Sequence, residues 1–473
     1  MKASILTFPL LCLTALAQAP GAHWSVISSG TNPSQRRENP GAADNNNMYV
    51  FGGQSGQSGG VRMNDLWKFD GTTWTEMTTN GAVGSPPARN QAGITWDFSI
   101  NKLVVFGGND AAGNILDDVW TWDPVTNAWT NMMPAAGPSA RRFTAMTYDP
   151  NTGSVLMFGG LDAAGTHLND TWILVGGSSW IQMAPTNLPP ERRQHHLVTR
   201  NGFGDVLLCG GQNATQSAPT KWKRDTWTWN GSDWTEIITT TLPASQVAND
   251  AAYDELRQRV VLASGNGSGG SPTALISEFD SITNDWVQRP LDPGIYKVSR
   301  YFAAYVPALG VTLKASGQIL NAAAPATQTY QFQSDVVADA AAYGTGCSGP
   351  GGALTLTSNS RPWADRTWSG TCNNLGANSL ALTVWGTNQA STPLQPLLPL
   401  AGASCLLLND ATILDGPAVP NAGSVDVSLA VPADPALSGY VLNVQVAELE
   451  FNGSFTWIGL HTSNGLALTI GVL

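Results

Sequence analysis

Charged side chains are scarce in this sequence. They make up 12% of its 473 residues, against about 25% in typical soluble domains. Helical bundles and coiled coils need charged helix faces and few helix breakers, so the 50 glycines and 29 prolines exclude both. Intrinsic disorder is excluded as well, because 42% of the residues are hydrophobic and 18 are tryptophan. The composition therefore predicts a large, turn-rich, mostly β protein.

Basic residues are also few. There are 23 Lys and Arg against 34 Asp and Glu, so the net charge is −11, and no stretch carries a run of Lys or Arg. Such a surface repels phosphate backbones and anionic lipid surfaces. We therefore expect neither a nucleic-acid partner nor binding to anionic membranes.

Long apolar segments are missing apart from one near the start of the chain. A positive charge at Lys2 precedes the apolar stretch Ile5 to Leu16, and Ala15-Leu16-Ala17 is a small-x-small cleavage site. Cleavage after Ala19 also fits but would leave Pro20 just behind the cut, so we prefer a mature start near Gln18. No later segment approaches the roughly 20 apolar residues of a spanning helix. We expect residues 1–17 to be a signal peptide, the protein to be secreted to the medium or the cell surface, and no membrane insertion.

Cysteine is rare, with five in the chain, and Cys12 leaves with the signal peptide. No CxxC motif and no Cys/His cluster indicates a metal site, so we expect neither a metal nor a cofactor. Cys209 lies in an apolar run and is interpreted as an inert core thiol. Cys347, Cys372 and Cys405 lie close together in sequence, and an exported chain can form one bridge among them.

An internal repeat organises the first two thirds of the chain. Its signature is an apolar strand that ends in a pair of small residues, and the first residue of the pair falls at positions 52, 107, 159, 210, 264 and 316. The spacing stays between 51 and 55 residues, a period typical of stacked repeat units. The copies are Tyr49-Val50-Phe51-Gly52-Gly53, Val104-Val105-Phe106-Gly107-Gly108, Leu156-Met157-Phe158-Gly159-Gly160, Leu207-Leu208-Cys209-Gly210-Gly211, Val261-Leu262-Ala263-Ser264-Gly265 and Leu313-Lys314-Ala315-Ser316-Gly317.

Aromatic strands keep step with this signature. About a dozen residues after each of the first four pairs comes an Asp-x-Trp strand, and a short turn then leads to a second strand that opens with tryptophan at 74, 129, 180, 234 or 286. Each repeat thus predicts about four short strands, which cannot bury both faces alone. We expect the repeats to stack around an axis, with the glycine pair allowing a close approach and the tryptophans filling the wedge between sheets.

These motifs resemble the kelch repeat over residues 23 to 333. The match is strong in repeats one to four and weaker in repeat five, where Ser264 replaces the first Gly and Ser277 the first Trp, and in repeat six, which has no downstream Trp. The resemblance implies a β-propeller. The segment His23-Trp24-Ser25-Val26 looks like the missing fourth strand of the last repeat, so we expect six blades with the ring closed by this N-terminal strand.

The last part of the chain does not continue the repeat. Residues 334–346 are small and Ala-rich and are interpreted as a linker, and residues 347–473 show short β runs separated by turns, which predicts a small antiparallel β-sandwich. The segments Gly344–Gly349 and Ser463–Gly471 resemble a C-terminal module of secreted bacterial proteins. That resemblance implies a disulfide between Cys347 and Cys405.

The sequence offers little catalytic machinery. It has no GxSxG, HExxH or P-loop motif. Secreted kelch propellers, which this sequence resembles, include copper radical oxidases, and that chemistry needs two His and two Tyr ligands. His195 and His196 are adjacent in a predicted strand and point to opposite faces, so they cannot both easily meet one metal. Carboxylates at strand starts, such as Asp117 and Asp118, are interpreted as caps of loop backbone.

A face of the propeller is the better candidate site. By resemblance, Arg36, Arg89, Arg141 and Arg192 occupy matching positions near one mouth of the central channel, where they would hold a carboxylate or sulfate group; the alternative is that they pair with neighbouring Asp and backbone carbonyls. Gln246 takes that position in repeat five. The loop from Gln212 to Arg224 carries Trp222 among cations and is a candidate contact site for sugar or protein.

The pattern favours a non-enzymatic, secreted binding scaffold that presents propeller loops to a protein or glycan ligand. The alternative is a carbohydrate-active enzyme, oxidase-like or glycan-processing, that uses the mouth of the channel.

Overall fold

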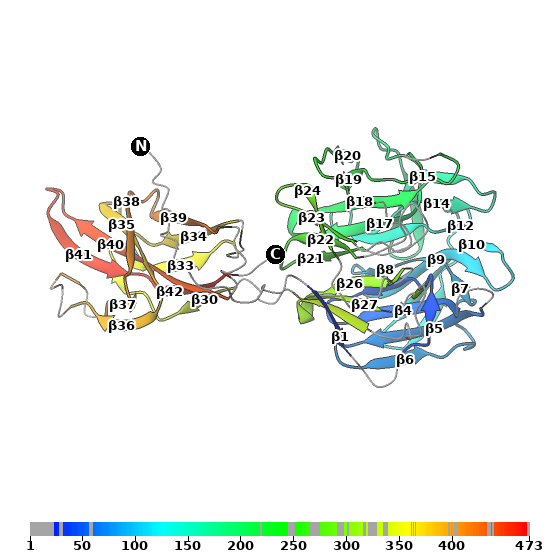
Figure 1. The fold of residues 1–473 in the computed structure, drawn as a ribbon, viewed down its shortest axis with the longest axis horizontal. Coiled ribbons are helices and arrows are strands. Elements are labelled where there is room, and N and C mark those ends of the chain that lie inside the picture. The colour runs from blue at the N-terminus through cyan, green and yellow to red at the C-terminus, as the bar shows by residue number, and fades with distance from the viewer. Residues whose placement is uncertain are drawn as a thin grey trace. The chain divides into compact units, whose positions relative to one another are not determined.

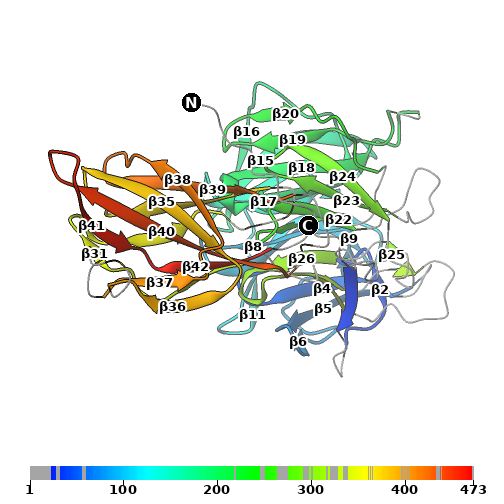
Figure 2. The ribbon, with the colours of Figure 1, turned by 60° about the vertical axis from the view of Figure 1, so that its left-hand side comes forward.

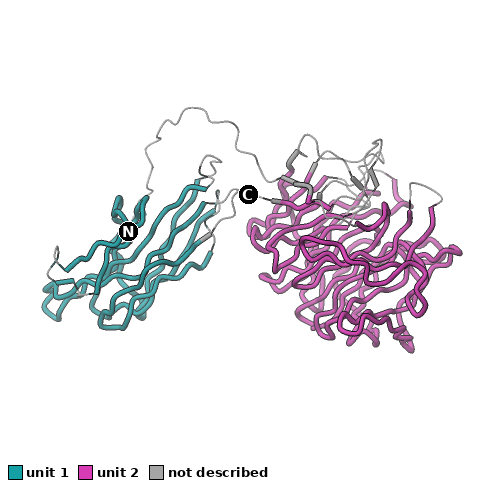
Figure 3. The backbone as a smooth tube through the Cα atoms, turned by 90° about the horizontal axis from the view of Figure 1, so that it is seen from below, with its two compact units in different colours: residues 1–23, 334–473 teal, residues 24–333 magenta. Residues whose placement is uncertain are grey.

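The computed structural model divides the chain into two compact units (Figure 3). The N-terminal unit holds Trp24–Gln333 and the C-terminal unit holds Ser334–Leu473. The residues that the structure describes are 23–27, 32–55, 60–217, 220–244, 251–263, 275–290, 298–299, 302–315, 318–319, 329–333, 339–360, 362, 364, 366–395, 398, 400–401, 404–432, 437, 439–470. The predicted signal peptide and Gln246 lie outside these residues.

Six antiparallel sheets of four or five strands build the described part of the N-terminal unit (Figure 1). We number them one to six in chain order. Sheet one contains β2 (Arg36–Arg37), β3 (Gly41–Ala43), β4 (Met48–Ser55), β5 (Arg62–Phe69) and β6 (Trp74–Thr78). Sheet two contains β7 (Arg89–Asn90), β8 (Gly93–Asp97), β9 (Lys102–Asp110), β10 (Ile115–Asp123) and β11 (Ala128–Asn131). Sheet three contains β12 (Arg141–Arg142), β13 (Ala145–Asp149), β14 (Ser154–Asp162), β15 (His167–Val175) and β16 (Ser179–Met183).

The later sheets follow the same order with fewer short strands. Sheet four contains β17 (Arg193–Arg200), β18 (Asp205–Gln212), β19 (Thr226–Trp229) and β20 (Trp234–Ile237), and the 3-10 turn η1 (Asn201–Phe203) joins its first two strands. Sheet five contains β21 (Ala251–Asp254), β22 (Arg259–Ala263), β23 (Leu275–Asp280) and β24 (Asp285–Pro290). Sheet six contains β26 (Phe302–Val306), β27 (Val311–Ala315), β29 (Thr329–Gln333) and β1 (His23–Ile27), with the 3-10 turn η2 (Pro307–Leu309) after β26. A separate pair is formed by β25 (Val298–Ser299) and β28 (Gln318–Ile319).

The innermost strands of the six sheets contact one another in a closed cycle. β3 contacts β8, and the chain of contacts runs on through β13, β17, β21 and β26 back to β3. β1 pairs with β29 on the outside of sheet six, where the sequence leads us to expect it, and in Figure 1 this dark blue strand lies with the yellow-green strands of that sheet. The first and last segments of the N-terminal unit therefore share one sheet.

Apolar side chains fill the space between neighbouring sheets. Between sheets one and two, Tyr49 and Phe51 share one core with Trp96 and Trp122, and the rings of Tyr49 and Trp96 stack with centroids 5.2 Å apart. Sheets two and three, three and four, four and five, and six and one share further cores of this kind. The tryptophans thus lie in the wedges for which their large apolar area suits them.

The outer tryptophans also carry a polar joint between sheets. In sheets one, two, four and five, the indole N–H near the start of the outermost strand donates to a threonine hydroxyl on the neighbouring sheet, at 2.8 to 3.0 Å. The pairs are Trp74–Thr329, Trp129–Thr78, Trp234–Thr171 and Trp286–Thr226. The Trp180 indole of sheet three has no hydrogen-bond partner among the described residues. The first of these pairs joins sheet one to sheet six, so it repeats at the closure the joint that holds consecutive sheets.

Two main sheets build the C-terminal unit (Figure 2). The larger contains β30 (Asp339–Tyr343), β42 (Gly465–Thr469), β40 (Val441–Phe451), β41 (Trp457–Thr462), β35 (Ser379–Gly386) and β38 (Ile413–Ala418), and the smaller contains β33 (Thr355–Ser358), β34 (Thr367–Asn373) and β39 (Ser424–Ala430). Two short pairs are β31 (Ser348–Gly349) with β32 (Gly352–Ala353), and β36 (Gln389–Pro393) with β37 (Leu406–Asn409). One core joins the two main sheets and includes Trp368 of the smaller and Val444 of the larger.

One element corrects the prediction of a linker over residues 334–346. Residues 339–343 form β30, which pairs along its whole length with β42. Ala340 lies opposite Leu468 and packs against the core of the C-terminal unit. A run of alanines resembles a linker in composition, yet small side chains also suit a sheet edge when their neighbours supply the apolar bulk.

Candidate functional site

The four predicted arginines are buried in the sheets. Arg36, Arg89, Arg141 and Arg192 are at most 1% exposed. Arg141 donates from Nη1 and Nη2 to the two carboxylate oxygens of Asp170 at 2.7 and 2.8 Å, from Nη1 to the Gly159 carbonyl, and from Nε to the Ser139 carbonyl. The same bidentate geometry pairs Arg36 with Asp65, Arg89 with Asp118, and Arg192 with Asp225.

A tryptophan completes each of these pairs. The Trp172 indole N–H donates to Asp170 Oδ2 at 2.7 Å, and Trp67, Trp120 and Trp227 do the same to their own aspartates. At Asp225 burial alone would raise the carboxyl pKa, but the Arg192 guanidinium outweighs burial and holds the pKa below its ordinary value. Each aspartate is thus held between an arginine and an indole.

This geometry matches the second of the two interpretations of the arginines. Their Nη and Nε donors are used on aspartates and backbone carbonyls inside the fold, so they offer little to a ligand at the mouth. The interpretation of Asp118 as a cap of loop backbone is corrected, because its carboxylate accepts from the buried Arg89.

The glycine pair explains how each buried arginine reaches the preceding sheet. Gly159 and Gly160 have φ values of +59° and +108°, a region that favours glycine. A Cβ on Gly159 would lie 2.8 Å from the Leu168 carbonyl oxygen and 2.9 Å from the carbonyl oxygen of Arg192 in sheet four. The Gly160 N–H donates to that same Arg192 carbonyl at 3.0 Å. The pair therefore makes room for the backbone of the next sheet's arginine.

The channel opens at the end where the innermost strands begin, which we call the N-mouth. Its rim is formed by Glu38, Gln91, Phe143 and Gln194, which all have left-handed φ values between +52° and +62°. Backbone bonds link them from sheet to sheet, because Gln91 N–H donates to Glu38, Phe143 N–H to Gln91, and Gln194 N–H to Phe143, at 2.9 to 3.1 Å. The rim is thus a hydrogen-bonded arc with side chains at fixed places.

A second set of arginines lies at this rim. Arg142 and Arg193 directly follow two of the buried arginines, and both guanidinium groups lie 5.6 Å from the centroid of the Phe143 ring. Burial lowers the pKa of Arg193, and the like charge of Arg142 lowers it further, against an opposite effect of Glu38. The Nε atoms of Arg142 and Arg193 are buried without a hydrogen-bond partner among the described residues. The two guanidinium groups therefore lie beside the same Phe143 ring, and the Nε donor of each makes no hydrogen bond to the described residues.

Sequence reasoning missed these residues although a signal was present. The chain carries the doublets Arg36-Arg37, Arg141-Arg142 and Arg192-Arg193. Successive side chains of a strand point to opposite faces, so one arginine of a doublet enters the sheet and the next lies outside it. Arg37 follows this rule, since it is partly exposed and donates to Gln54 Oε1 at 3.2 Å.

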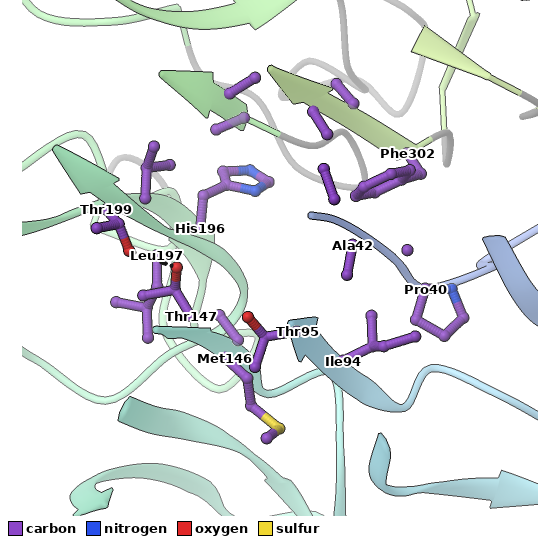
Figure 4. A pocket seen from close by; sticks show the side chains of 18 of the residues that line it. Pro40, Ala42, Ile94, Thr95, Met146, Thr147, His196, Leu197, Thr199 and Phe302 are labelled. Atoms are coloured by element: carbon purple, nitrogen blue, oxygen red, sulfur yellow. Dashed lines mark hydrogen bonds between the residues drawn. The ribbon is translucent and has the colours of Figure 1, made fainter. Parts of the chain in front are cut away.

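The channel itself is lined by residues of all six sheets. Its cavity has a volume of about 320 Å³. In Figure 4 the side chains of Thr147, His196 and Phe302 come from three different strands and surround one opening, with Thr147 bonded to Thr199 at 2.8 Å. His195 does not share this position, because its Nε2 lies 3.0 Å from the Phe158 carbonyl oxygen of sheet three. The two adjacent histidines therefore point apart, as the strand geometry predicts.

Trp222 lies beside the rim rather than free on a loop. It is partly buried, forms an isolated bridge to Gln212, and has the Lys221 ammonium 5.0 Å from its ring centroid. Lys223 donates to Gln216 Oε1 at 3.0 Å. The loop thus folds onto the end of β18.

The C-terminal unit contains the disulfide Cys347–Cys405, which is the pairing that the module resemblance implied. Cys209 and Cys372 are buried thiols outside the bridge. Of the described residues, Cys347, Cys405 and His461 form a group with ligand atoms close enough for a metal ion. Both sulfur atoms are bonded to each other, so neither is a free thiolate. Over the described residues, no helix has the length and apolar character needed to cross a membrane.

Comparison with known proteins extends these observations. The family model "KLHDC2/KLHL20/DRC7 Kelch-repeats domain" matches residues 12–149 and 100–306, together more than half of the chain. The Acyl-CoA-binding domain-containing protein 4 of Arabidopsis thaliana is 28% identical over 198 residues, covering 39% of this chain and 28% of that protein. The Kelch domain-containing protein 10 of Rattus norvegicus is 29% identical over 196 residues, covering 37% and 45%.

These curated relatives are longer than the matched region, which spans less than half of either. Among solved structures, "Structure of YjhT" superposes with a TM-score of 0.48 at 14% identity, covering 64% of this chain and 95% of that chain.

Proposed function

The chain belongs to the KLHDC2/KLHL20/DRC7 Kelch-repeats domain family, and from this membership we propose that its N-terminal unit is a six-bladed β-propeller that works as a protein-binding scaffold. The closed cycle of contacts among the six innermost strands supports the blade number. We propose further that the C-terminal unit is an antiparallel β-sandwich, because one core joins its two main sheets.

The observation that carries a binding role is the arrangement of Arg142, Phe143 and Arg193 at the N-mouth. Two guanidinium groups flank one aromatic ring, and the charge of one lowers the pKa of the other. An anion placed between them would relieve that repulsion and would meet planar donors suited to a carboxylate. We therefore assign the N-mouth to an acidic segment of a partner protein, with Phe143 covering an apolar part of it.

This assignment is tested with a fluorescein-labelled peptide of alternating glutamate and serine, and with the same peptide carrying lysine for glutamate. We expect fluorescence anisotropy to show binding of the acidic peptide only. The double substitution Arg142→Ala, Arg193→Ala removes hydrogen bonds to a charged group and is expected to weaken binding at least about tenfold. Lys102→Ala removes one positive charge from a surface ion pair with Asp123 and serves as the control.

Urea unfolding of the double variant should match that of the unsubstituted chain, because both arginine side chains are partly exposed and neither forms an ion pair with a described residue of its own sheet that the substitution would break. Unchanged affinity in the folded double variant would contradict a binding role for the N-mouth. An equal loss in Lys102→Ala would show that the peptide responds to net charge alone, and would contradict it as well.

We also propose that the protein is exported and that residues 1–17 are removed. The charged start, the apolar stretch and the small-x-small site support this, and the disulfide of the C-terminal unit is the kind of bond that oxidising compartments maintain. N-terminal sequencing of protein recovered from the culture medium should give a start near Gln18. Recovery only from inside the cells with Met1 retained would contradict export. No observation on the described residues favours the carbohydrate-active alternative, which stays a prediction.

A further inference from the structure

The other end of the channel, where the innermost strands finish, is built differently from the N-mouth. We call it the C-mouth and define it by Asp44, Phe98, Tyr148, Glu255 and Pro307, which line the channel there. Bonds between sheets fix its turns, because Ala308 N–H donates to the Asn45 carbonyl at 2.8 Å, Asn151 Nδ2 to the Gly204 carbonyl at 2.6 Å, and Asn201 Nδ2 to Glu255 Oε1 at 2.5 Å. The C-mouth is therefore a set of turns held in fixed positions.

Apolar side chains stand out from these turns. Phe98, Phe203 and Leu309 are 43%, 40% and 37% exposed and come from the first turns of sheets two, four and six. Phe98 packs edge-on against Tyr148 with ring centroids 5.3 Å apart. Turn positions at a surface favour small polar residues. Leu309 packs beside Gly71 of sheet one and Phe203 beside Arg200, yet all three large apolar groups keep more than a third of their surface exposed.

The accessible charge at the C-mouth is negative. Asp44 and Glu255 are partly exposed and line the channel on either side of sheet six. The Asp44 carboxylate caps its own turn, because it accepts from the backbone N–H groups of Asn46 and Asn47 and from the Tyr49 hydroxyl, so Glu255 is the carboxylate that an incoming cation would meet. The nearby cations are neutralised, because Arg200 and Arg257 are 3% exposed and paired with Asp205 and Glu278. Lys102, behind the turn of sheet two, pairs with Asp123.

The Tyr148 phenol at this end also lies in a negatively charged environment. Burial raises the pKa of Tyr148, and the charges of Asp97 and Asp149 raise it further. A partner that approaches this end therefore meets carboxylates and aromatic rings, without competing free cations among the described residues that line it.

The fold already contains the contact that such a partner would make. The Arg200 guanidinium lies 4.8 Å from the centroid of the Phe203 ring, within the range of a cation–π interaction. Phe98 lies at the equivalent turn of sheet two with an exposed ring. A guanidinium from outside would find there a ring, and at the channel opening a carboxylate.

We propose that the C-mouth is a second docking surface, which binds a basic segment of a partner protein in which arginine or lysine alternates with apolar residues. The cation enters the channel opening beside Glu255, and the flanking apolar side chains rest on Phe98, Phe203 and Leu309. Charge complementarity selects this occupant, because the C-mouth is acidic. The N-mouth, in contrast, carries the cations Arg142 and Arg193. The two ends of one channel thus select partners of opposite charge.

The test uses the full chain and a fluorescein-labelled peptide of alternating arginine and leucine, with a glutamate–leucine peptide as the probe of opposite charge. We expect anisotropy to show binding of the arginine peptide alone. Glu255→Gln and Phe98→Ala should each weaken it at least fivefold, and the two together more. Glu236→Gln and Ile181→Ala are the matched controls, because these residues are exposed on the outermost strands β20 and β16; both should keep the affinity within twofold. Urea unfolding of each variant verifies that it is folded.

Several outcomes would overturn the proposal. These are absence of binding, equal loss in the controls, unchanged affinity in the folded Glu255→Gln, Phe98→Ala double variant, and loss of the arginine peptide in Arg142→Ala, Arg193→Ala, which would place it at the N-mouth. Sedimentation velocity adds one more arm. A concentration-dependent dimer that Phe98→Ala abolishes would assign the surface to a second copy of this chain, which also contradicts the proposal.

Discussion

Sheets three and five bury arginine in different places of the same architecture. In sheet three Arg141 lies at the N-mouth end and is held by Asp170. In sheet five Arg257 and Arg259 lie on the turn side of β22 and share Glu278, which is 0% exposed, at 2.8 and 3.1 Å. Arg259 also reaches Asp280 at 3.2 Å.

The difference follows from two positions in the third strand. Repeat five has Leu275 and Ser277 where repeat three has Asp170 and Trp172, so an arginine at the N-mouth end would meet neither a carboxylate nor an indole. The buried charges of sheet five lie instead at the opposite end, where the Arg257 guanidinium is 4.7 Å from the Phe332 ring centroid in sheet six. A buried arginine is tolerated only beside a carboxylate. Both sheets therefore contain a buried arginine–carboxylate pair, although the pair lies at opposite ends of the two sheets.

Breaking the pair in sheet three should have the largest effect. Arg141→Met removes a cation that is 1% exposed and leaves the Asp170 carboxylate, which is 22% exposed, without its partner. We expect a loss of about 3 kcal/mol of unfolding free energy, the lower end of the range for a broken buried pair. Arg259→Met in sheet five should cost less, about 2 kcal/mol, because Glu278 keeps its bond to Arg257, and Asp280, which loses its bond to Arg259, still accepts from the backbone N–H groups of Ile282 and Thr283. Urea denaturation of both variants measures the two losses. Equal losses of unfolding free energy in the two variants would mean that the second arginine beside Glu278 does not compensate for the removal of Arg259.

The glycine pair gives the next largest effect. Gly159→Ala forces a left-handed φ on alanine and places its Cβ against two carbonyl oxygens, so we expect a loss of roughly 2 to 3 kcal/mol. Gly165→Ala is the matched control, because Gly165 has φ +83° with no neighbour within 4 Å of a Cβ, and only the backbone strain of about 1 kcal/mol remains. Thermal unfolding compares them; a control as damaging as Gly159→Ala would remove the close approach as the cause.

The hydrogen bond from an outer tryptophan to a threonine should contribute equally to stability whether it reaches sheet three or starts from sheet five. Trp234→Phe and Trp286→Phe each remove one N–H bond to a buried threonine, Thr171 or Thr226, and each should cost about 1 to 1.5 kcal/mol. A double-mutant cycle with Thr171→Val isolates the bond in sheet four. A coupling energy near zero there would show that the tryptophan acts through packing alone.

The smallest effect concerns pH and belongs to sheet four. Burial holds the pKa of His195 well below its usual value near 6.5, so the unfolded chain binds a proton that the folded chain rejects. Stability is therefore full above about pH 6.5 and is lost as the pH falls, by about 1 kcal/mol between pH 6.5 and 5.5. His195→Gln should flatten that part of the pH profile of urea unfolding. A slope that persists unchanged in the variant would assign it to other groups.

Much of the fold could be predicted because the same sequence motifs recur in every one of the first four repeats. The glycine pairs, the Asp-x-Trp strands and the downstream tryptophans lie in the sheets as the period predicts. The strand β30 was missed because three of its five residues are alanine and its pairing with β42 spans more than a hundred residues of sequence. Composition describes a segment but does not identify its partner strand.

The site was harder to predict than the fold. A resemblance could place Arg141 near a mouth, but only the neighbouring Asp170 and Gly159 show that its donors are used. The partly exposed position falls to Arg142, one residue further along, because successive side chains of a strand point to opposite faces. The network of Glu278 in sheet five breaks the period and therefore could not be read from it.

The central claim is that the first arginine of a doublet stabilises the fold and that the second binds the acidic partner. One pair of variants tests this claim. Unfolding free energy and affinity for the glutamate–serine peptide are measured on Arg141→Met and on Arg142→Met, at a temperature where both are folded. We expect Arg141→Met to lose stability and keep its affinity, and Arg142→Met to keep its stability and lose affinity. The reverse pattern, or two variants that lose both properties together, would contradict the account.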